Sequence, residues 1–256
     1  MKVSILIPYY NRPRQLERSL WLLLRQTYPH DQYEIIIVDD GSMTALDYNA
    51  LSLSITDYLR HIPSVWCYPI RPASSPPRSP NTALRFAYTK CSGDYIIVTC
   101  PEIMVPLHGV ETMLAHGKMD RRNVPLLYCI AWNHKLSTVP WQMDLDSIQT
   151  LPDFMALRGE WGLNNYDMLG FRHHAGFTGA TREVWEQMNP FLPDTEDWGR
   201  SDSYWHQREN ELDLAPYPID LTVYHQWHEP VHGNIPQYSH KIKQIRKSQM
   251  DDGETL

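Results

Sequence analysis

Three short runs of β-branched, almost uncharged residues constrain the fold of this chain more than any other feature of its sequence. They are residues 3–7, 34–38 and 95–99, and they stop at Pro, Asp and Cys respectively. Continuous apolar strands of this kind suit a sheet that is covered on both faces. The sequence therefore predicts three buried strands.

The segments between these runs have helical periodicity. In residues 14–26 four leucines recur at helical spacing, and Pro13 stands where the first turn of a helix tolerates it. In residues 81–94, Ala83, Phe86 and Ala87 share one face, and Gly93 lies near the helix end. This alternation predicts an α/β fold, a mixed and mostly parallel sheet flanked by helices in a single domain. Ligands of such a sheet gather beyond the carboxyl ends of its strands.

Composition narrows the class of protein. A chain of 256 residues with 42% hydrophobic content is long enough for one well-packed domain, and a net charge of −7 argues against nucleic-acid binding. No apolar run approaches the roughly 18 to 20 residues of a membrane span, and the first residues turn polar too soon for a secretory signal. We expect a cytoplasmic protein, for which peripheral membrane association stays open. The four cysteines form no Cys-x-x-Cys pair, so neither a disulfide framework nor a zinc knuckle is indicated.

Polar side chains follow the predicted strands. Asp39 and Asp40 come directly after one of them, so at least one should point into the ligand crevice; an aspartate that caps the turn through Gly41 and Ser42 explains the pair equally well. The Pro- and Ser-rich stretch 69–81 predicts an irregular loop near the same edge, and its arginines, Arg71 and Arg78, could assist as the loop closes.

Candidate metal ligands occur in two places. Glu102 ends a buried strand, where its oxygens suit Mg²⁺ or Mn²⁺, although an exposed loop glutamate is the simpler alternative. His225 and His228 follow an apolar run, and one imidazole could bind a metal ion while the other orients it. A hydrogen-bonded structural histidine is the alternative for each.

The second half of the chain offers a candidate general base. A helix is expected over 181–188 and another from Ser201, which would cap it and place Asp202 in the first turn, where the helix dipole favours an ionised carboxylate. A plain helix-start aspartate is the alternative. A platform for a sugar could be formed by Trp198, Trp205 and Trp227, although tryptophan more often packs in a core. The remaining candidates for acceptor contact are His173 and His174 in a Gly-containing loop.

Taken together, four segments resemble the family 2 glycosyltransferases, which have the GT-A fold, a Rossmann-like sheet. The amino-terminal signature of that family is similar to VSILIPYYNRPRQLERSLWLLLRQTYPHDQYEIIIVDDGS, and its strand before Asp-x-Asp is similar to SGDYIIVTCPE. Its Gly-Ala-x-Arg-Glu helix resembles FTGATREVWEQMNPF, and its Trp-Gly-x-Glu-Asp motif resembles WGRSDSYWHQR.

The resemblance implies roles for particular residues. Residues matching nucleotide-sugar-binding positions are Pro8, Tyr10 and Asp40, with Asn11 and Asp39 beside them and Arg78 in the loop nearby. Glu102 falls at the last aspartate of the metal motif and Asp202 at the catalytic base, while the acceptor side includes Trp198, Gly199 and His174. Two departures stand out, because Cys100 replaces the first carboxylate of the metal motif and Ser201 replaces the usual glutamate.

The sequence thus predicts a glycosyltransferase of the hexosyl or N-acetylhexosaminyl class. It would move a sugar from a nucleotide diphosphate donor, UDP being the commonest in the family, to a hydroxyl of a glycan or other acceptor, with inversion and with Mn²⁺ or Mg²⁺. We expect residues 1–105 to bind the donor, residues 106–237 to bind the acceptor within the same domain, and residues 238–256 to form a polar tail. A carbohydrate- or nucleotide-sugar-binding module with weak or no catalysis, and a retaining enzyme, are the alternatives. A nucleotidyltransferase is disfavoured, because no Gly-rich loop with a lysine is present.

Overall fold

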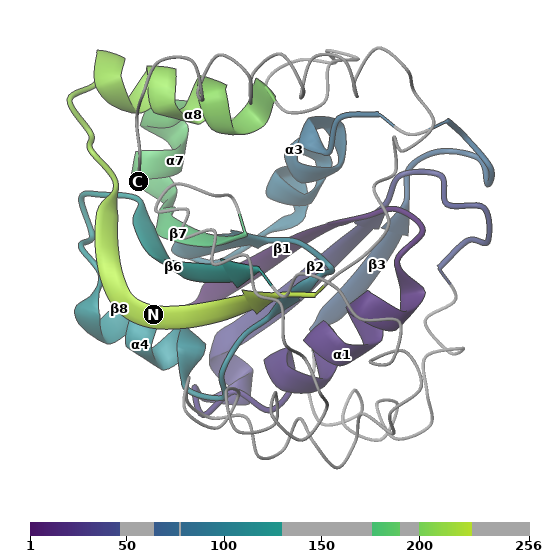
Figure 1. Ribbon diagram of the computed structural model, residues 1–256, viewed down its shortest axis with the longest axis horizontal. Helices are drawn as coiled ribbons and strands as arrows, with labels where there is room; N and C mark the ends of the chain where they lie inside the picture. Colours follow the sequence, from purple (N-terminus) through teal and green to yellow (C-terminus); the bar gives the residue numbers. More distant parts are fainter. Residues whose placement is uncertain (47–63, 77, 130–175, 190–199, 227–256) are drawn as a thin grey trace, which may run out of the picture.

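The computed structural model describes residues 1–46, 64–76, 78–129, 176–189 and 200–226 (Figure 1). Its strands are β1 (Val3–Tyr9), β2 (Tyr33–Asp39), β3 (Val65–Pro69), β4 (Tyr95–Thr99), β5 (Ile103–Met104), β6 (Asn123–Cys129), β7 (Phe177–Thr181) and β8 (Tyr217–His225). Its helices are α1 (Pro13–Leu23), a 3-10 turn η1 (His30–Gln32), α3 (Asn81–Lys90), α4 (Gly109–His116), α7 (Arg182–Met188) and α8 (Arg200–Glu211). The three predicted strands and the predicted helices are confirmed.

All described strands belong to one sheet. Their order is β3-β2-β1-β4-β7-β6-β8-β5, in which β1 pairs in parallel with both β2 and β4, and β2 pairs in parallel with β3. The strand β7 runs antiparallel to β4 and β6, while β8 is parallel to β6 and antiparallel to β5. This arrangement confirms the mixed, mostly parallel sheet that strand and helix alternation predicted.

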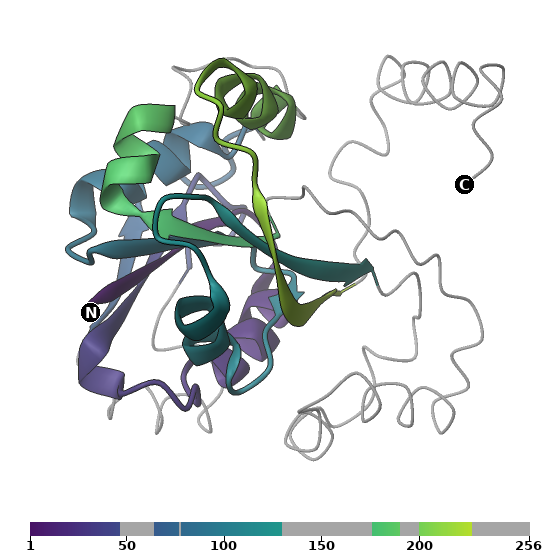
Figure 2. The ribbon, with the colours of Figure 1, turned by 90° about the vertical axis from the view of Figure 1, so that its left-hand side faces the viewer.

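Helices cover both faces of the sheet. Alternate residues of β1 point to opposite sides, so that Ile5 and Ile7 pack in a cluster with α1 and α4, whereas Leu6 packs with α3, α7 and Trp205 of α8. Figure 2 shows the sheet between these two layers. Two covered faces explain why β1, β2 and β4 are mostly apolar and almost wholly buried.

Local signals set the helix ends. Pro13 occupies the first turn of α1, as expected, and the hydroxyl of Thr181 caps α7 by accepting a hydrogen bond from the backbone of Val184. The prediction that Ser201 caps α8 is wrong, because the helix already begins at Arg200 and Ser201 lies inside its first turn. No helix in the described ranges is long and apolar enough to cross a membrane.

Candidate active site

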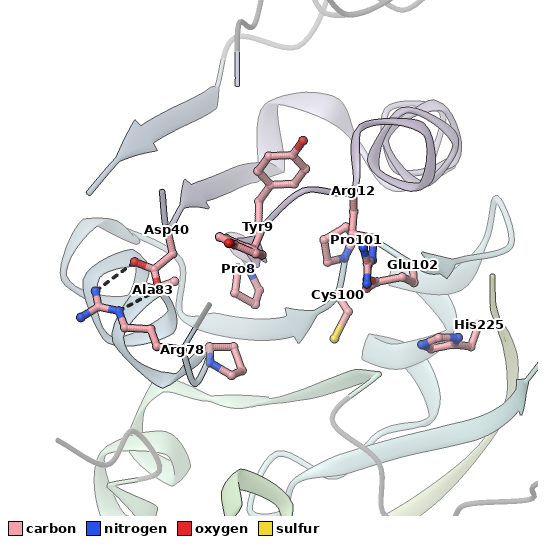
Figure 3. Close-up of a pocket in the computed structure, with 12 residues that line it drawn as sticks. Pro8, Tyr9, Arg12, Asp40, Arg78, Ala83, Cys100, Pro101, Glu102 and His225 are labelled. Carbon is pink, nitrogen blue, oxygen red and sulfur yellow. Dashed lines mark hydrogen bonds and ion pairs between the residues drawn. The ribbon is translucent and has the colours of Figure 1, made fainter. Parts of the chain in front are cut away.

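A cavity of about 200 Å³ lies at the carboxyl ends of β1, β2 and β4 (Figure 3). Its wall consists of Pro8, Tyr9, Tyr10 and Arg12 around the end of β1, Asp40 after β2, Arg78, Pro80 and Ala83 around the start of α3, Cys100, Pro101 and Glu102 after β4, and His225 at the end of β8. Six residues selected from the sequence therefore line one cavity: Pro8, Tyr10, Asp40, Arg78, Glu102 and His225.

The two aspartates after β2 have different surroundings. Asp39 closes the turn, because its Oδ1 accepts hydrogen bonds from the backbone and hydroxyl of Ser42 at 3.0 and 2.7 Å, and its Oδ2 accepts one from the backbone of Leu46 at 2.8 Å. The turn also needs Gly41, whose φ is +84° and whose added Cβ would lie 2.6 Å from the Cβ of Ser75. Asp39 thus caps the turn while Asp40 lines the cavity, and a ligand contact of Asp39 stays a prediction.

Two arginines of the predicted irregular loop hold the carboxylate of Asp40. Arg71 donates from Nε to Oδ1 over 2.7 Å, and Arg78 donates from Nε and Nη2 to the two oxygens over 2.8 and 2.9 Å. Arg71 also donates to the backbone oxygens of Asp40 and Pro76, at 2.8 and 2.7 Å. Because guanidinium groups are rigid forks, these bonds fix both the loop and the orientation of the carboxylate.

Asn11 and Tyr10 also join the loop after β1 to its neighbours. Asn11, which has a φ of 51°, donates from its backbone to the hydroxyl of Ser42 over 3.0 Å and accepts from the backbone of Met43 over 2.7 Å. Tyr10 donates its hydroxyl to the backbone oxygen of Ser75 over 2.8 Å. Asn11 thus links two loops and is not among the residues lining the cavity, while its place beside the ligand stays a prediction.

Glu102 and His225 are brought together by a strand pair. In the antiparallel pairing of β5 with β8, Ile103 faces His225, and the backbone of Gln226 donates to the carbonyl oxygen of Glu102 over 2.8 Å. The carboxylate of Glu102 accepts a hydrogen bond from Nε of Arg12 at 3.2 Å. Figure 3 places Arg12, Glu102 and His225 together on the wall opposite Asp40 and Arg78.

The described residues of this wall fit a divalent cation poorly. Cys100 stands where a first carboxylate would be, and no group of three or more His, Cys, Asp and Glu side chains is arranged for a metal within the described ranges. At an effective dielectric constant of about 20, two unit charges roughly 4 Å apart interact by about 4 kcal/mol, so the charge of Arg12 opposes the binding of a second cation beside Glu102. His228 lies outside the described residues, and the need for Mn²⁺ or Mg²⁺ stays a prediction.

Asp202 lies in the first turn of α8, and the description of that turn is limited to its backbone. The rest of the helix is anchored through Glu209, which forms a fully buried ion pair with Arg122. Arg122 also donates to the hydroxyl of Thr178 over 3.2 Å, and its guanidinium lies 5.5 Å from the ring of Trp205.

Trp205 is buried in the core. It is 1% exposed and packs edge to face against Trp185, with ring centroids 5.4 Å apart. Its proposed part in a sugar platform is therefore wrong. The other acceptor-side predictions, Trp198, Gly199, Trp227, His173 and His174, lie outside the described residues.

Sequence reasoning did not select Arg12 or Arg122. Arg12 follows the Pro-x-Tyr-Asn segment directly, and this place between strand and helix was the signal that could have marked it as a cavity residue. Arg122 has no comparable signal, because a lone arginine in a polar stretch reads as exposed until the packing of α8 is known.

Comparisons with known proteins agree with the fold. Residues 4–99 match the model of the family described as glycosyl transferase family 2. Over 40 residues the chain is 42% identical to glycosyltransferase AglE of Haloferax volcanii, a match that covers 16% of this chain and 13% of AglE.

Crystal structures of TarS from S. aureus have a similar fold. The 1–349 form superimposes with a TM-score of 0.57 at 12% identity, covering 88% of this chain and 60% of TarS. The same form in complex with UDP gives 0.58 at 13% identity, over 89% and 61% of the two chains, and the form in complex with UDP-GlcNAc gives 0.58 at 14%, over 90% and 60%. This chain thus spans about 60% of the length of those TarS chains. Residues 4–99 thus match glycosyl transferase family 2, and the described part of the chain shares the fold of the TarS structures.

Proposed function

We propose that this protein transfers a sugar from a nucleoside diphosphate donor to a hydroxyl group of an acceptor. The observation that carries the proposal is a cavity at the carboxyl ends of the strands, where Tyr10, Asp40 and Glu102 meet from three separate segments. The TarS structures were solved with UDP and UDP-GlcNAc, which favours a UDP-sugar of the hexosyl or N-acetylhexosaminyl class as donor.

The nucleoside would bind at the end of the cavity that contains Asp40. Pro8 and Tyr10 offer apolar and aromatic surface there, and the carboxylate of Asp40 can accept hydrogen bonds from ribose hydroxyls or from the base. Arg71 and Arg78 keep that carboxylate in a fixed orientation, which lowers the ordering needed on binding. In this proposal residues 1–105 bind the donor and residues 106–237 bind the acceptor.

The chemistry would be a direct displacement with inversion. The acceptor oxygen attacks the anomeric carbon, the bond from that carbon to the diphosphate oxygen breaks, and the diphosphate leaves with the electron pair. Asp202 would take the proton of the acceptor hydroxyl, and its place in the first turn of α8 favours the ionised carboxylate that this role needs.

Replacement of the proposed base tests this mechanism. Asp202→Asn should leave UDP affinity near that of the wild type while transfer from UDP-GlcNAc, measured by UDP release, falls by roughly 10² to 10⁴-fold. Asp220→Asn, at an exposed position of β8, is the matched control and should keep full activity. Turnover by Asp202→Asn at the wild-type rate excludes Asp202 as the base. Anomeric analysis of the product separates inversion from retention.

The donor itself can be found by a thermal-shift screen. UDP-, GDP- and dTDP-sugars, each with Mn²⁺ and with EDTA, should raise the unfolding midpoint only where they bind the folded protein. The comparison of Mn²⁺ with EDTA also tests whether donor binding requires the expected divalent cation.

A second candidate function is a nucleotide-sugar-binding module that does not catalyse transfer. It is favoured by Cys100 at the position of a metal-binding carboxylate and by the contact of Arg12 with Glu102. Tight donor binding without any donor hydrolysis or transfer would support this candidate over the enzyme.

A further inference from the structure

The cavity has a positively charged group at each end. Arg78 lies at the end of the cavity that contains Asp40, and Arg12 lies at the end that contains Glu102 and His225. Pro8 and Tyr9 lie between the two ends (Figure 3). A nucleoside diphosphate is itself elongated, with an uncharged base at one end and two anionic phosphates at the other. If the nucleoside lies at Asp40, as proposed above, its diphosphate reaches the end that contains Arg12.

Arg12 is held in position by its neighbours. Its Nε donates to Glu102 over 3.2 Å and its Nη1 donates to the backbone oxygen of Asn11 over 3.2 Å. The residue also stands directly before Pro13, where α1 begins, so its backbone is fixed by the helix. A guanidinium carries five N–H donors in a planar fork, which allows one arginine to contact a carboxylate and a phosphate together.

The wall around Glu102 is unsuited to a metal ion. Cys100 supplies a thiol in place of a carboxylate, and Glu102 already accepts a hydrogen bond from Nε of Arg12. A guanidinium remains charged at every physiological pH, and its bidentate hydrogen bonds match the geometry of phosphate oxygens.

We propose that Arg12, positioned by Glu102, binds the diphosphate of the donor and supplies the positive charge that a divalent cation would otherwise supply. When the bond between the anomeric carbon and the diphosphate oxygen breaks, the electron pair stays on that oxygen. Arg12 then faces the charge that grows on the leaving group, and no metal ion is required for donor binding. This inference rests on the proposed function.

Calorimetric titration of the full chain with UDP and with uridine tests the inference. In EDTA the wild type should bind UDP, and 5 mM Mn²⁺ should change its affinity by less than about threefold, because a guanidinium rather than a metal ion contacts the diphosphate. Arg12→Ala should weaken UDP binding by roughly 10 to 100-fold, as expected for a lost charge-assisted hydrogen bond, and should leave uridine binding unchanged. Arg14→Ala, an exposed arginine two residues further along, makes the same charge change and should bind UDP like the wild type.

Two further variants probe the metal alternative. Glu102→Gln keeps an oxygen that can accept the hydrogen bond of Arg12 but removes the negative charge, so it should bind UDP in EDTA up to about tenfold more tightly than the wild type. Loss of a Mn²⁺ effect on UDP affinity in this variant would instead identify Glu102 as a metal ligand. Cys100→Asp restores a second carboxylate beside Glu102, so Mn²⁺ should tighten its UDP binding by about tenfold, a dependence that the wild type lacks. Circular dichroism and unfolding midpoints check that each variant is folded.

The outcomes separate this inference from the function on which it rests. If EDTA abolishes wild-type UDP binding and Mn²⁺ restores it, or if folded Arg12→Ala binds UDP normally, the role of Arg12 is refuted while the donor-binding function stands. If the wild type binds none of UDP, GDP and dTDP in either EDTA or Mn²⁺, the proposed function itself fails, and the inference fails with it.

Discussion

Ion pairs between arginine and carboxylate side chains occur in two regions of this molecule, the cavity and the core beneath α8. The two regions differ in how far solvent can reach the side chains. At the cavity the side chains of Arg12 and Arg78 are 14% and 25% exposed, and a ligand can reach both. In the core Arg122 and Glu209 are each 1% exposed. The cavity pairs can therefore exchange partners with a ligand, whereas the core pair can only hold α8 against the sheet. The same two functional groups serve binding in one place and anchoring in the other.

The largest effect is expected from breaking the core pair. Arg122→Ala leaves Glu209 as a buried charge without its guanidinium, so the free energy of unfolding should fall by about 3 to 5 kcal/mol in urea titrations. The neighbouring Arg121, which donates to the backbone oxygen of Asp213, is the matched control; because it is partly exposed, Arg121→Ala should lose less than about 1 kcal/mol. A loss of similar size in both variants would show that burial does not separate the two regions.

An intermediate effect is expected at the nucleoside end of the cavity. Asp40→Asn removes the charged acceptor beside Arg71 and Arg78, so affinity for both UDP and uridine should fall by roughly 10 to 100-fold. This result would contrast with Arg12→Ala, which should affect UDP alone. Asp31→Asn, at an exposed position far from the cavity, is the control for titration calorimetry. Unchanged uridine affinity in Asp40→Asn would remove the nucleoside from this end of the cavity.

The smallest effect is expected where a buried carboxylate is held by hydroxyl and backbone donors without an arginine. Glu34 accepts from the hydroxyl of Ser4 at 2.6 Å and from the backbone and hydroxyl of Ser92 at 2.7 and 2.8 Å. Burial acts to raise the pKa of Glu34, but these hydrogen bonds outweigh it and lower the pKa below 4.5. Glu34→Gln should lose about 1 to 2 kcal/mol of unfolding free energy at pH 7.

The pH dependence of this loss has a definite sign. Because the folded-state pKa of Glu34 is lowered, its stabilising contribution is complete above the unfolded value of about 4.5 and disappears as pH falls through the folded value. The difference between the wild type and Glu34→Gln in urea titrations should therefore shrink below pH 4.5. A difference that grows on acidification would contradict the assignment.

Sequence reasoning found the elements whose signal is local. The strands β1, β2 and β4 are mostly apolar because both faces of the sheet are covered, and α1 and α3 have a clear helical period. It did not find β3, an edge strand with Trp66 48% exposed, or the two-residue β5. It also missed β7. This strand contains Gly179, where an added Cβ would lie 2.6 Å from the ring of Tyr95, so the need for glycine becomes clear only from the packing.

In the candidate site, too, sequence reasoning found the residues that have a local signal and missed the contacts that depend on the fold. Strand ends located Asp40 and Glu102, since parallel strands bring their carboxyl ends to one edge. The choice between Asp39 and Asp40 was not predictable, because it depends on which of two adjacent side chains faces the turn. The contact of Arg12 with Glu102 was not predictable either, because it joins residues 90 positions apart.

The pairing of β5 with β8 has a consequence for how the protein is made. Tyr10, Asp40 and Arg78 are synthesised well before His225 and Gln226, which the wall behind Glu102 needs. A nascent chain that has not yet been synthesised through β8 can assemble the nucleoside end of the cavity while the opposite wall is still missing. The cavity therefore gains its complete wall only after β8 has been synthesised.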